Sequence, residues 1–375
     1  MQIRIITHLI VLLGAVGCMR SQGLPDTDGH AEIDSAANSI PAHHQADGTF
    51  TNTNGQAINK SLGDLIKAFN EQKKPDPVDF PVLTPNQILI ENPTANQITW
   101  IGHSTFLLQV DGLNILTDPH FTERASPFSF MGPKRIVPPA LTLEQLPNID
   151  AVIISHNHYD HMDEDTLYSL VQQQPDNPPH IFVPLGLKSW FDEDDFPNVT
   201  ELDWWQALTL GETTFVSVPV QHWSARGIFD RNKSLWAGWV IDTPHLRFLS
   251  VGDSGYSADF KKIGECFPGI DLAAIPIGAY NPRWFMQDAH MNPDEAVQVF
   301  QDLGAEQGIG MHWGTFILTF EEMTEPPKRL HQAMANAQLS PDRFVAMQHG
   351  ETKILEANQP YPSESTCIQN EKSSG

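Results

Sequence analysis

The stretch from residue 155 to 161 reads Ser-His-Asn-His-Tyr-Asp-His and follows directly on the apolar run 151–154. The apolar run has the composition of a buried strand, and the polar stretch has that of the loop after it. A strand that ends in a tight loop can direct alternate side chains toward two adjacent metal ions, and imidazole and carboxylate suit zinc and its first-row neighbours. We therefore predict that His156, His158, Asp160 and His161 bind metal.

Three further residues have the chemistry to complete a site for two metal ions. His222, Asp253 and His312 each end or follow a run rich in β-forming residues. An isolated aspartate in a turn usually caps backbone amides, so each residue alone is a weak signal. Together with the first four they supply the roughly six or seven ligands, one of them a bridging carboxylate, that a two-metal site needs.

Composition excludes some classes of partner. The chain has 375 residues, enough for a large core, and a formal net charge of −24 from 22 Lys plus Arg against 46 Asp plus Glu. Nucleic acid is not an expected partner because neutralising phosphates requires clustered cations. Bulk charge also opposes binding to anionic lipid, so membrane contact would have to be local, apolar or covalent.

The amino terminus resembles an export signal. Residues 1–17 begin with a positive charge and continue as an apolar run too short to span a membrane. Cys18 follows at a position that resembles a bacterial lipoprotein processing site, which predicts a lipidated, membrane-anchored protein of the cell envelope; simple secretion is the alternative. Three cysteines cannot form a disulfide framework, and we expect Cys266 and Cys367 to be unpaired.

The rest of the chain divides by composition. We assign residues 1–18 to the signal, 19–97 to a tether and extension with a short helix at 61–70, 98–357 to one hydrolase domain, and 358–375 to a polar tail. Residues 19–59 are expected to be flexible, and His43 and His44 in this polar tract to be incidental. Many strand candidates interspersed with helix candidates at 164–173, 293–303 and 326–337 favour an α/β sandwich, with two facing sheets and helices outside.

The motif and its downstream partners resemble the metallo-β-lactamase superfamily. Within this superfamily the chain resembles most the phospholipase branch, which hydrolyses N-acyl-phosphatidylethanolamine. The resemblance depends on the blocks Met-Gly-Pro-Lys-Arg (131–135) and Pro-Arg-Trp-Phe-Met (282–286). The segments that carry this resemblance lie between Ile98 and Thr315 and include 99–105, 116–119, 124–127, 154–161, 221–223, 252–256, 278–286 and 312–316. The family's distinct amino-terminal region is not obviously reproduced, which leaves a homodimer open.

The resemblance implies a role for each site residue. His156, His158 and His222 would hold one zinc ion, Asp160, His161 and His312 the other, and Asp253 would bridge them. His290 matches a family histidine near the substrate phosphate, and Asp160 would also orient the attacking hydroxide. Two zinc ions lower the pKa of a shared water, although iron and manganese accept the same ligands.

The implied activity is hydrolysis of N-acyl-phosphatidylethanolamine-like phospholipids to phosphatidic acid and an N-acylethanolamine. A metal-dependent lactonase is the alternative within hydrolases, and a non-catalytic envelope lipoprotein is the alternative outside them. Membrane contact would come from a lipid anchor or an apolar surface.

Several residues have two interpretations from sequence. Arg124, Lys134 and Arg135 could meet a head-group phosphate or be solvated, and Trp284 and Phe285 could line an acyl-chain entrance or belong to the core. Asp118 could orient a ligand histidine or cap the turn before Pro119. For His103 we expect a structural hydrogen bond.

Overall fold

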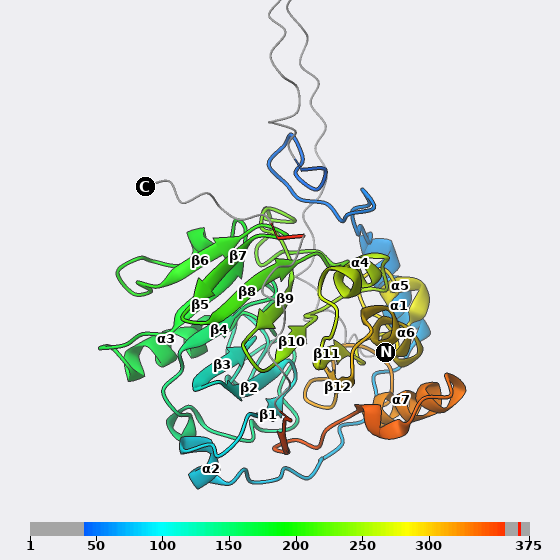
Figure 1. Cartoon of the computed structure of the whole chain (residues 1–375). Helices are drawn as coiled ribbons and strands as arrows, with labels where there is room; N and C mark the ends of the chain where they lie inside the picture. The colour runs from blue at the N-terminus through cyan, green and yellow to red at the C-terminus, as the bar shows by residue number, and fades with distance from the viewer. Residues whose placement is uncertain (1–40, 357–366, 369–375) are drawn as a thin grey trace, which may run out of the picture.

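Two mixed sheets lie face to face in the computed structural model of the chain, with helices outside them (Figure 1). The predicted α/β sandwich is therefore confirmed. The structure describes residues 41–356 and 367–368. The export signal, Cys18 and most of the predicted tail lie outside the described residues.

Each sheet is seven-stranded and combines antiparallel with parallel pairs. The first has the order β14 (Thr352–Ile354), β1 (Gln97–Gly102), β2 (Thr105–Val110), β3 (Leu113–Thr117), β4 (Ala151–Ile153), β5 (His180–Pro184) and β6 (Val199–Leu202). The second has the order β13 (Phe344–Val345), β12 (Gln307–Met311), β11 (Leu272–Pro276), β10 (Arg247–Ser250), β9 (Gly238–Asp242), β8 (Thr213–Val218) and β7 (Ala207–Leu210).

Alternation along the strands of the first sheet divides the core into two layers. Phe106 and Leu108 of β2 belong to the large cluster between the sheets, whereas Leu107 packs in a smaller cluster with Leu167 and Leu170 of α3. Successive side chains of a strand point to opposite faces, so a strand that is apolar throughout is buried on both. The first sheet is therefore covered by the second sheet on one face and by α3 on the other.

Helices complete the outer layers. The α-helices are α1 (Leu62–Glu71), α2 (Gln87–Glu91), α3 (Glu164–Gln173), α4 (Asp259–Cys266), α5 (Arg283–Met286), α6 (Pro293–Leu303) and α7 (Glu325–Asn336). Helix α6 contacts α4, α7 and β11, so these helices cover the second sheet. Among the described residues, no helix is both long and apolar enough to cross a membrane.

Several elements match their sequence predictions. The expected helix at 61–70 is α1, which starts after Ser61 because Ser61 and Asp64 form a reciprocal capping box. The turn between β2 and β3 is formed by Asp111 and Gly112, whose φ angles of 49° and 81° suit a tight hairpin. Helices α2, α4 and α5 were not among the predicted helices, because each is short.

The prediction of a flexible tether up to residue 59 is wrong for the part that the structure describes. Phe50 joins the main core cluster, and Thr51, Asn52 and Ile58 are buried. The backbone N–H of Phe50 donates to the carbonyl of Asn232. A few buried side chains in a polar tract are enough to hold this segment on the domain, and composition alone does not reveal them.

The prediction that Cys266 and Cys367 are unpaired is also wrong. They form a disulfide across a sequence separation of 101 residues, with Cα atoms 5.8 Å apart. Cys367 and Ile368, in the predicted polar tail, pack against the main core cluster. Two cysteines this far apart in sequence carry no spacing signal, so only the fold shows that they meet.

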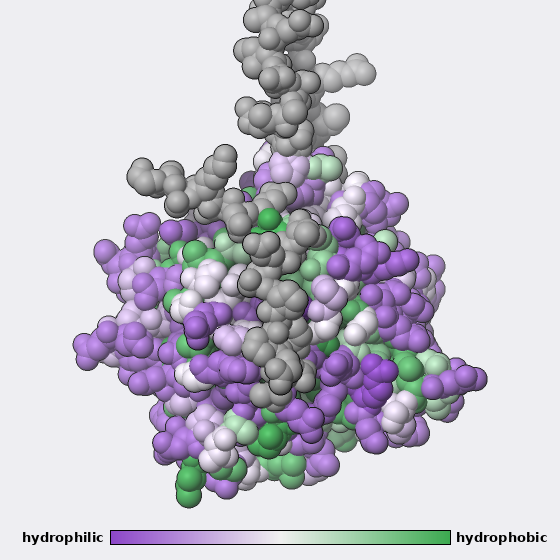
Figure 2. All heavy atoms as spheres, viewed as in Figure 1, coloured by the Kyte–Doolittle hydropathy of each residue, from purple (hydrophilic) through white to green (hydrophobic). Residues whose placement is uncertain are grey.

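One face of the molecule is seen to be mainly hydrophilic. Figure 2 shows one face of the molecule, on which hydrophobic residues are scattered among a majority of hydrophilic ones. This agrees with the net charge of −24.

Candidate metal centre

The predicted metal ligands come from strand ends that meet at one edge of the sandwich. The loop 155–161 follows β4, His222 follows β8, Asp253 follows β10, and His312 follows β12. Their imidazole and carboxylate atoms form overlapping groups within 4.8 Å of one another. The structure thus brings together all seven residues that the sequence indicated.

One group consists of His156, His158 and His222. His158 Nδ1 lies 2.7 Å from His156 Nε2 and 3.3 Å from His222 Nε2. His156 and His222 are fully buried. Three imidazoles with converging nitrogen atoms form a typical ligand set for zinc and related metals.

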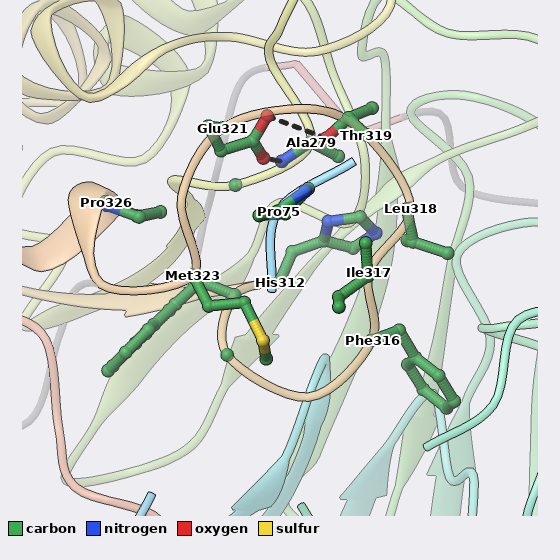
Figure 3. A pocket seen from close by; sticks show the side chains of 13 residues that line it. Pro75, Ala279, His312, Phe316, Ile317, Leu318, Thr319, Glu321, Met323 and Pro326 are labelled. Atoms are coloured by element: carbon green, nitrogen blue, oxygen red, sulfur yellow. Dashed lines mark hydrogen bonds between the residues drawn. The ribbon is translucent and has the colours of Figure 1, made fainter. Parts of the chain in front are cut away.

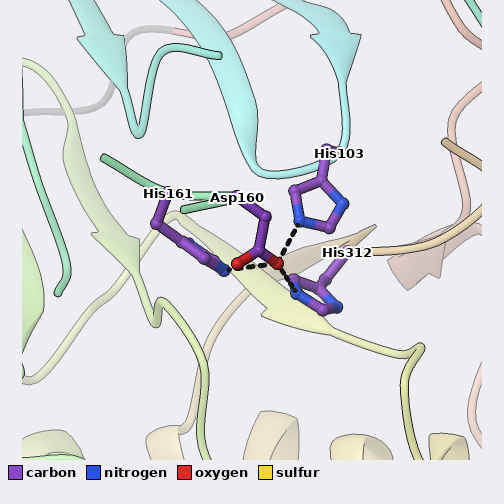
Figure 4. Close-up of side chains that lie close together, drawn as sticks. All are labelled: His103, Asp160, His161 and His312. Atoms are coloured by element: carbon purple, nitrogen blue, oxygen red, sulfur yellow. Dashed lines mark hydrogen bonds and ion pairs between the residues drawn. The ribbon is translucent and has the colours of Figure 1, made fainter. Parts of the chain in front are cut away.

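The second group consists of His103, Asp160, His161 and His312 (Figure 4). Asp160 Oδ2 lies 2.9 Å from His103 Nε2, 3.2 Å from His312 Nε2 and 3.5 Å from His161 Nε2. The predicted set of Asp160, His161 and His312 is therefore assembled, with His103 as an additional member. Sequence reasoning gave His103 a structural hydrogen bond, and the structure directs that bond to a predicted ligand.

Asp253 lies between the two groups. Its Oδ2 is 3.1 Å from His161 Nε2 and 3.2 Å from His312 Nε2, and 3.9 Å from both His156 Nε2 and His222 Nε2. Asp253 thus faces ligands of both groups, and its role as a bridge between two ions stays a prediction.

Left-handed backbone conformations accompany the site. His103, Asp118 and His312 have φ angles of 55°, 35° and 62°. Such conformations are uncommon for residues other than glycine and persist where the surrounding structure enforces them. Gly252, at φ 67°, precedes Asp253, and a Cβ there would lie 2.6 Å from the Cβ of Ser155, so the two ligand loops approach more closely than a side chain allows.

Hydrogen bonds to Nδ1 of three histidine rings determine that the opposite nitrogen, Nε2, faces the predicted metal site. His161 Nδ1 lies 2.8 Å from Asp118 Oδ2, and His222 Nδ1 lies 3.0 Å from the carbonyl oxygen of Ala289. His156 Nδ1 lies 2.9 Å from the hydroxyl of Ser155. An imidazole whose Nδ1 is engaged in this way presents Nε2 to a metal.

Protonation equilibria favour metal binding by the first group. Burial, together with the neighbouring imidazoles, holds the pKa of His156 well below its usual value, and burial lowers the pKa of His158 to about 3. Burial also holds the pKa of His222 well below its usual value. These imidazoles are neutral at physiological pH, so their lone pairs are available to a metal.

The second group stabilises positive charge. Burial opposes protonation of His161 and His312, but nearby carboxylates outweigh it, raising the pKa of His161 well above its usual value and that of His312 to about 9. Although burial acts against ionisation of Asp160 and Asp253, adjacent imidazoles hold the pKa of both carboxyl groups well below the usual range. Among the described residues, the buried Asp253 Oδ1 has no hydrogen-bond partner, and His161 Nε2 makes no hydrogen bond although Asp253 Oδ2 lies 3.1 Å away. A divalent cation would supply both the charge and the missing partners, so the residues fit a metal.

His290 lies at the rim of this centre. Its Nδ1 is 3.9 Å from Asp253 Oδ2, and its ring is 5.2 Å from that of His222 and 5.4 Å from that of His312. Burial lowers the pKa of His290 to about 4, so the imidazole is neutral. Its role near a substrate phosphate stays a prediction.

The predicted basic cluster is engaged within the protein. Arg124 donates to the carbonyl oxygens of Ser129 and Gly132, and Lys134 forms an ion pair with Glu123 at 2.7 Å. Arg135 is buried, with Nη2 2.9 Å from His120 Nδ1 and its guanidinium over the ring of Phe316. These contacts argue against Arg135 meeting a phosphate directly and indicate that it supports the residues around the centre.

Trp284 and Phe285 lie on α5, against the segment that contains α1. Trp284 Nε1 donates to Glu71, and the Lys67 ammonium lies 4.3 Å from the centroid of a Trp284 ring. Lys60 lies 5.9 Å from the centroid of Phe285. Their role in substrate binding stays a prediction, whereas their role in docking α1 is visible.

Sequence reasoning missed Asn52. Its side-chain oxygen accepts the backbone N–H of His222 at 3.0 Å, and its amide donates to the carbonyl of His222 at 3.1 Å. Asn52 therefore fixes the backbone of a predicted ligand from 170 residues away. No sequence signal distinguishes this asparagine from others in the same polar tract.

A pocket lies beside His312 (Figure 3). The loop after β12 contributes Ile317, Leu318 and Met323 to its lining, and Pro75 also lines it. At one end, Glu321 accepts hydrogen bonds from the N–H of Ala279 and the hydroxyl of Thr319. This network holds the loop that follows His312.

Known proteins are similar to this chain in sequence and in fold. A family profile described as a beta-lactamase superfamily domain matches residues 113–313. The N-acyl-phosphatidylethanolamine-hydrolyzing phospholipase D 1 of Caenorhabditis elegans is 44% identical over 265 residues, which cover 68% of this chain and 74% of that protein. The mitochondrial enzyme of the same description from Saccharomyces cerevisiae is 36% identical over 266 residues, covering 69% of this chain and 56% of that protein.

Solved structures agree with the fold. An isothiocyanate hydrolase from Delia radicum gut bacteria superposes with a TM-score of 0.56 at 18% identity, covering 70% of this chain and 99% of its own. The metallo hydrolase Igni18 from Ignicoccus hospitalis gives a TM-score of 0.52 at 22% identity, with 70% and 99% covered. With the two-sheet sandwich, the converging histidines and aspartates, and these relatives, the chain belongs to the beta-lactamase superfamily and is a metal-dependent hydrolase.

Proposed function

We propose that this hydrolase is a zinc-dependent phosphodiesterase that cleaves N-acyl-phosphatidylethanolamine-like phospholipids to phosphatidic acid and an N-acylethanolamine. The observation that carries the proposal is the assembly of seven histidine and aspartate ligands, with Asp253 between two groups, in a chain 44% identical to a phospholipase D of that specificity. When bound, two zinc ions supply Lewis acidity and lower the pKa of a coordinated water to near neutrality.

The residues around the centre have different roles in the proposed reaction. Asp160, held by His103 and His312, orients the attacking water toward phosphorus. His290, neutral and without a hydrogen-bond partner on Nδ1 among the described residues, binds a non-bridging phosphate oxygen as its N–H tautomer. Burial excludes bulk water and strengthens these interactions.

Two exposed apolar side chains suit a lipid substrate. Phe130 is 76% and Phe229 82% exposed. Arg226, in the loop that carries Phe229, donates to the carbonyls of Asn157 and Met162, so this loop is attached to the loop of metal ligands. We propose that Phe130 and Phe229 contact the membrane from which the substrate is drawn.

We also propose that the protein is exported and anchored through lipidated Cys18. The disulfide between Cys266 and Cys367 supports export because such bonds form and persist in oxidising compartments. Changing Cys18→Ser is expected to release the protein from the membrane fraction, and unchanged partitioning would contradict the anchor.

A comparison of two substrates, each given alone, tests the proposed activity. Purified protein is given an N-acyl-phosphatidylethanolamine and, separately, an acyl lactone, and the products are identified by mass spectrometry. Release of phosphatidic acid and N-acylethanolamine is expected. Lactone hydrolysis without phosphodiester cleavage would overturn the proposal.

A further inference from the structure

A second cluster of metal-ligating side chains shares no residue with the metal centre. His43 Nε2 lies 2.7 Å from Asp203 Oδ1, and His44 Nε2 lies 2.7 Å from Asp203 Oδ2. The three ligand atoms lie within 4.8 Å of one another. Two consecutive imidazoles thus converge on the two oxygens of one carboxylate.

The three side chains are held in place by their surroundings. Asp203 Oδ1 also accepts the backbone N–H of Trp204 at 2.8 Å. The His43 ring packs 4.4 Å from a Trp204 ring, and the His44 ring 5.1 Å from that of Phe50. The carbonyl of His43 accepts the N–H of Thr51, which closes residues 43–51 into a small loop. The ligand atoms are therefore oriented before any ion binds.

The chemistry of the cluster suits zinc. Two imidazoles and a carboxylate are a recurrent zinc ligand set that leaves a fourth position for water. Burial raises the pKa of Asp203, but hydrogen bonds from His43, His44 and Trp204 outweigh it and lower the pKa overall, so the carboxylate is ionised at neutral pH. Side-chain exposures of 27% for His44 and 13% for Asp203 leave a path for water.

The distances between the three ligand atoms are compatible with zinc binding. Two ligands of a tetrahedral zinc ion lie roughly 3.4 Å apart, so the atoms here must separate by several tenths of an ångström. Within the metal centre, His156 Nε2 and His158 Nδ1 are equally close, at 2.7 Å.

We propose that His43, His44 and Asp203, with water as a fourth ligand, bind a zinc ion that fastens the segment 41–59 onto the hydrolase domain. This segment carries Asn52, which holds the backbone of His222 from both sides. By holding this segment in place, the ion keeps Asn52 against the backbone of His222. It takes no part in the reaction.

Zinc content measured by equilibrium dialysis tests the proposal. In the double variant His43→Gln/His44→Gln, each glutamine retains an N–H donor for Asp203 but is a poor zinc ligand. The variant is expected to retain about one zinc ion per chain fewer than wild type. In wild type, zinc should slow proteolysis within residues 41–59, and the variant should lose this protection.

Two controls separate this ion from the metal centre. His245→Gln removes another imidazole, which lies 2.8 Å from Asp111, and should leave zinc content unchanged. His156→Ala/His161→Ala disables the metal centre and should still retain about one zinc ion per chain. Equal zinc content in wild type and the His43→Gln/His44→Gln variant would overturn the proposal and leave the cluster as a hydrogen-bonded clasp.

Discussion

The carboxylate of Asp118 lies directly behind the metal-facing imidazole of His161. Asp118 Oδ2 is 2.8 Å from His161 Nδ1, while His161 Nε2 is 3.1 Å from Asp253 Oδ2. Asp118 also accepts the backbone N–H of Ser155 at 2.6 Å and its hydroxyl at 2.7 Å. Of the two roles that the sequence left open, the contact to His161 matches the first, the orientation of a ligand histidine; the contacts to Ser155 add a cap at the start of the ligand loop.

Replacing Asp118 by Asn is expected to weaken zinc binding about 10- to 100-fold, since the orienting carboxylate of His161 is lost. Competition with a chelator measures the affinity. Asp150→Asn is the matched control, because Asp150 accepts the N–H of Asn114 at 2.8 Å from a comparable strand end. Equal effects of the two substitutions would mean that Asp118 acts only as a cap.

His103→Ala is expected to lower kcat about 10- to 100-fold with little change in KM, because Asp160 loses the partner 2.9 Å from its Oδ2. Steady-state kinetics separates the two constants. His349→Ala is the control, since His349 is a buried histidine that stacks 4.2 Å from Trp100. A rise in KM alone would show that His103 serves substrate binding instead.

His290→Ala is expected to reduce turnover about 100- to 1,000-fold, the usual cost of losing one group that stabilises charge in the transition state. Zinc content should stay at the wild-type level, because the seven proposed ligands do not include His290. Metal analysis alongside the activity assay checks both parts. Loss of zinc in this variant would make His290 a ligand and remove its proposed role.

Zinc binding is expected to release protons at neutral pH. In the metal-free protein the pKa of His312 is raised to about 9: burial lowers it, but Asp253 and Asp160 outweigh that effect. His312 is therefore protonated below that pH, whereas zinc requires its lone pair, so affinity should rise with pH toward about 9. Calorimetry at pH 7 in buffers of different ionisation enthalpy detects the protons. Identical heats in all buffers would contradict the expectation.

Breaking the disulfide is expected to lower the free energy of unfolding by about 2–4 kcal/mol, because it closes a long loop in the unfolded chain. Urea denaturation with and without reductant measures the change. Cys367→Ser should show the lower stability under both conditions, since it cannot form the bond to Cys266. Equal stability of reduced and oxidised wild type would show that the bond contributes nothing.

The sandwich and the metal ligands were predictable because their signals are local. The apolar strand β4 leads directly into a loop that carries four predicted ligands. His222, Asp253 and His312 each follow a strand. Since parallel strands end at a common edge, their placement together follows from the fold.

The supporting contacts were not predictable because they join distant segments. Asn52 reaches His222 across 170 residues, and His43 and His44 reach Asp203 across 160 and 159. Cys266 meets Cys367 in the same way. In each case an ordinary residue acquires a role only when tertiary packing brings its partner within reach.

Hydrolysis in water enriched in ¹⁸O tests the central claim most directly. Purified zinc-loaded protein is incubated with N-acyl-phosphatidylethanolamine, and the products are analysed by mass spectrometry. Attack of water on phosphorus predicts one ¹⁸O atom in the phosphatidic acid and none in the N-acylethanolamine, with turnover lost in Asp160→Asn. Label in a released fatty acid, or full turnover by Asp160→Asn, would contradict the account.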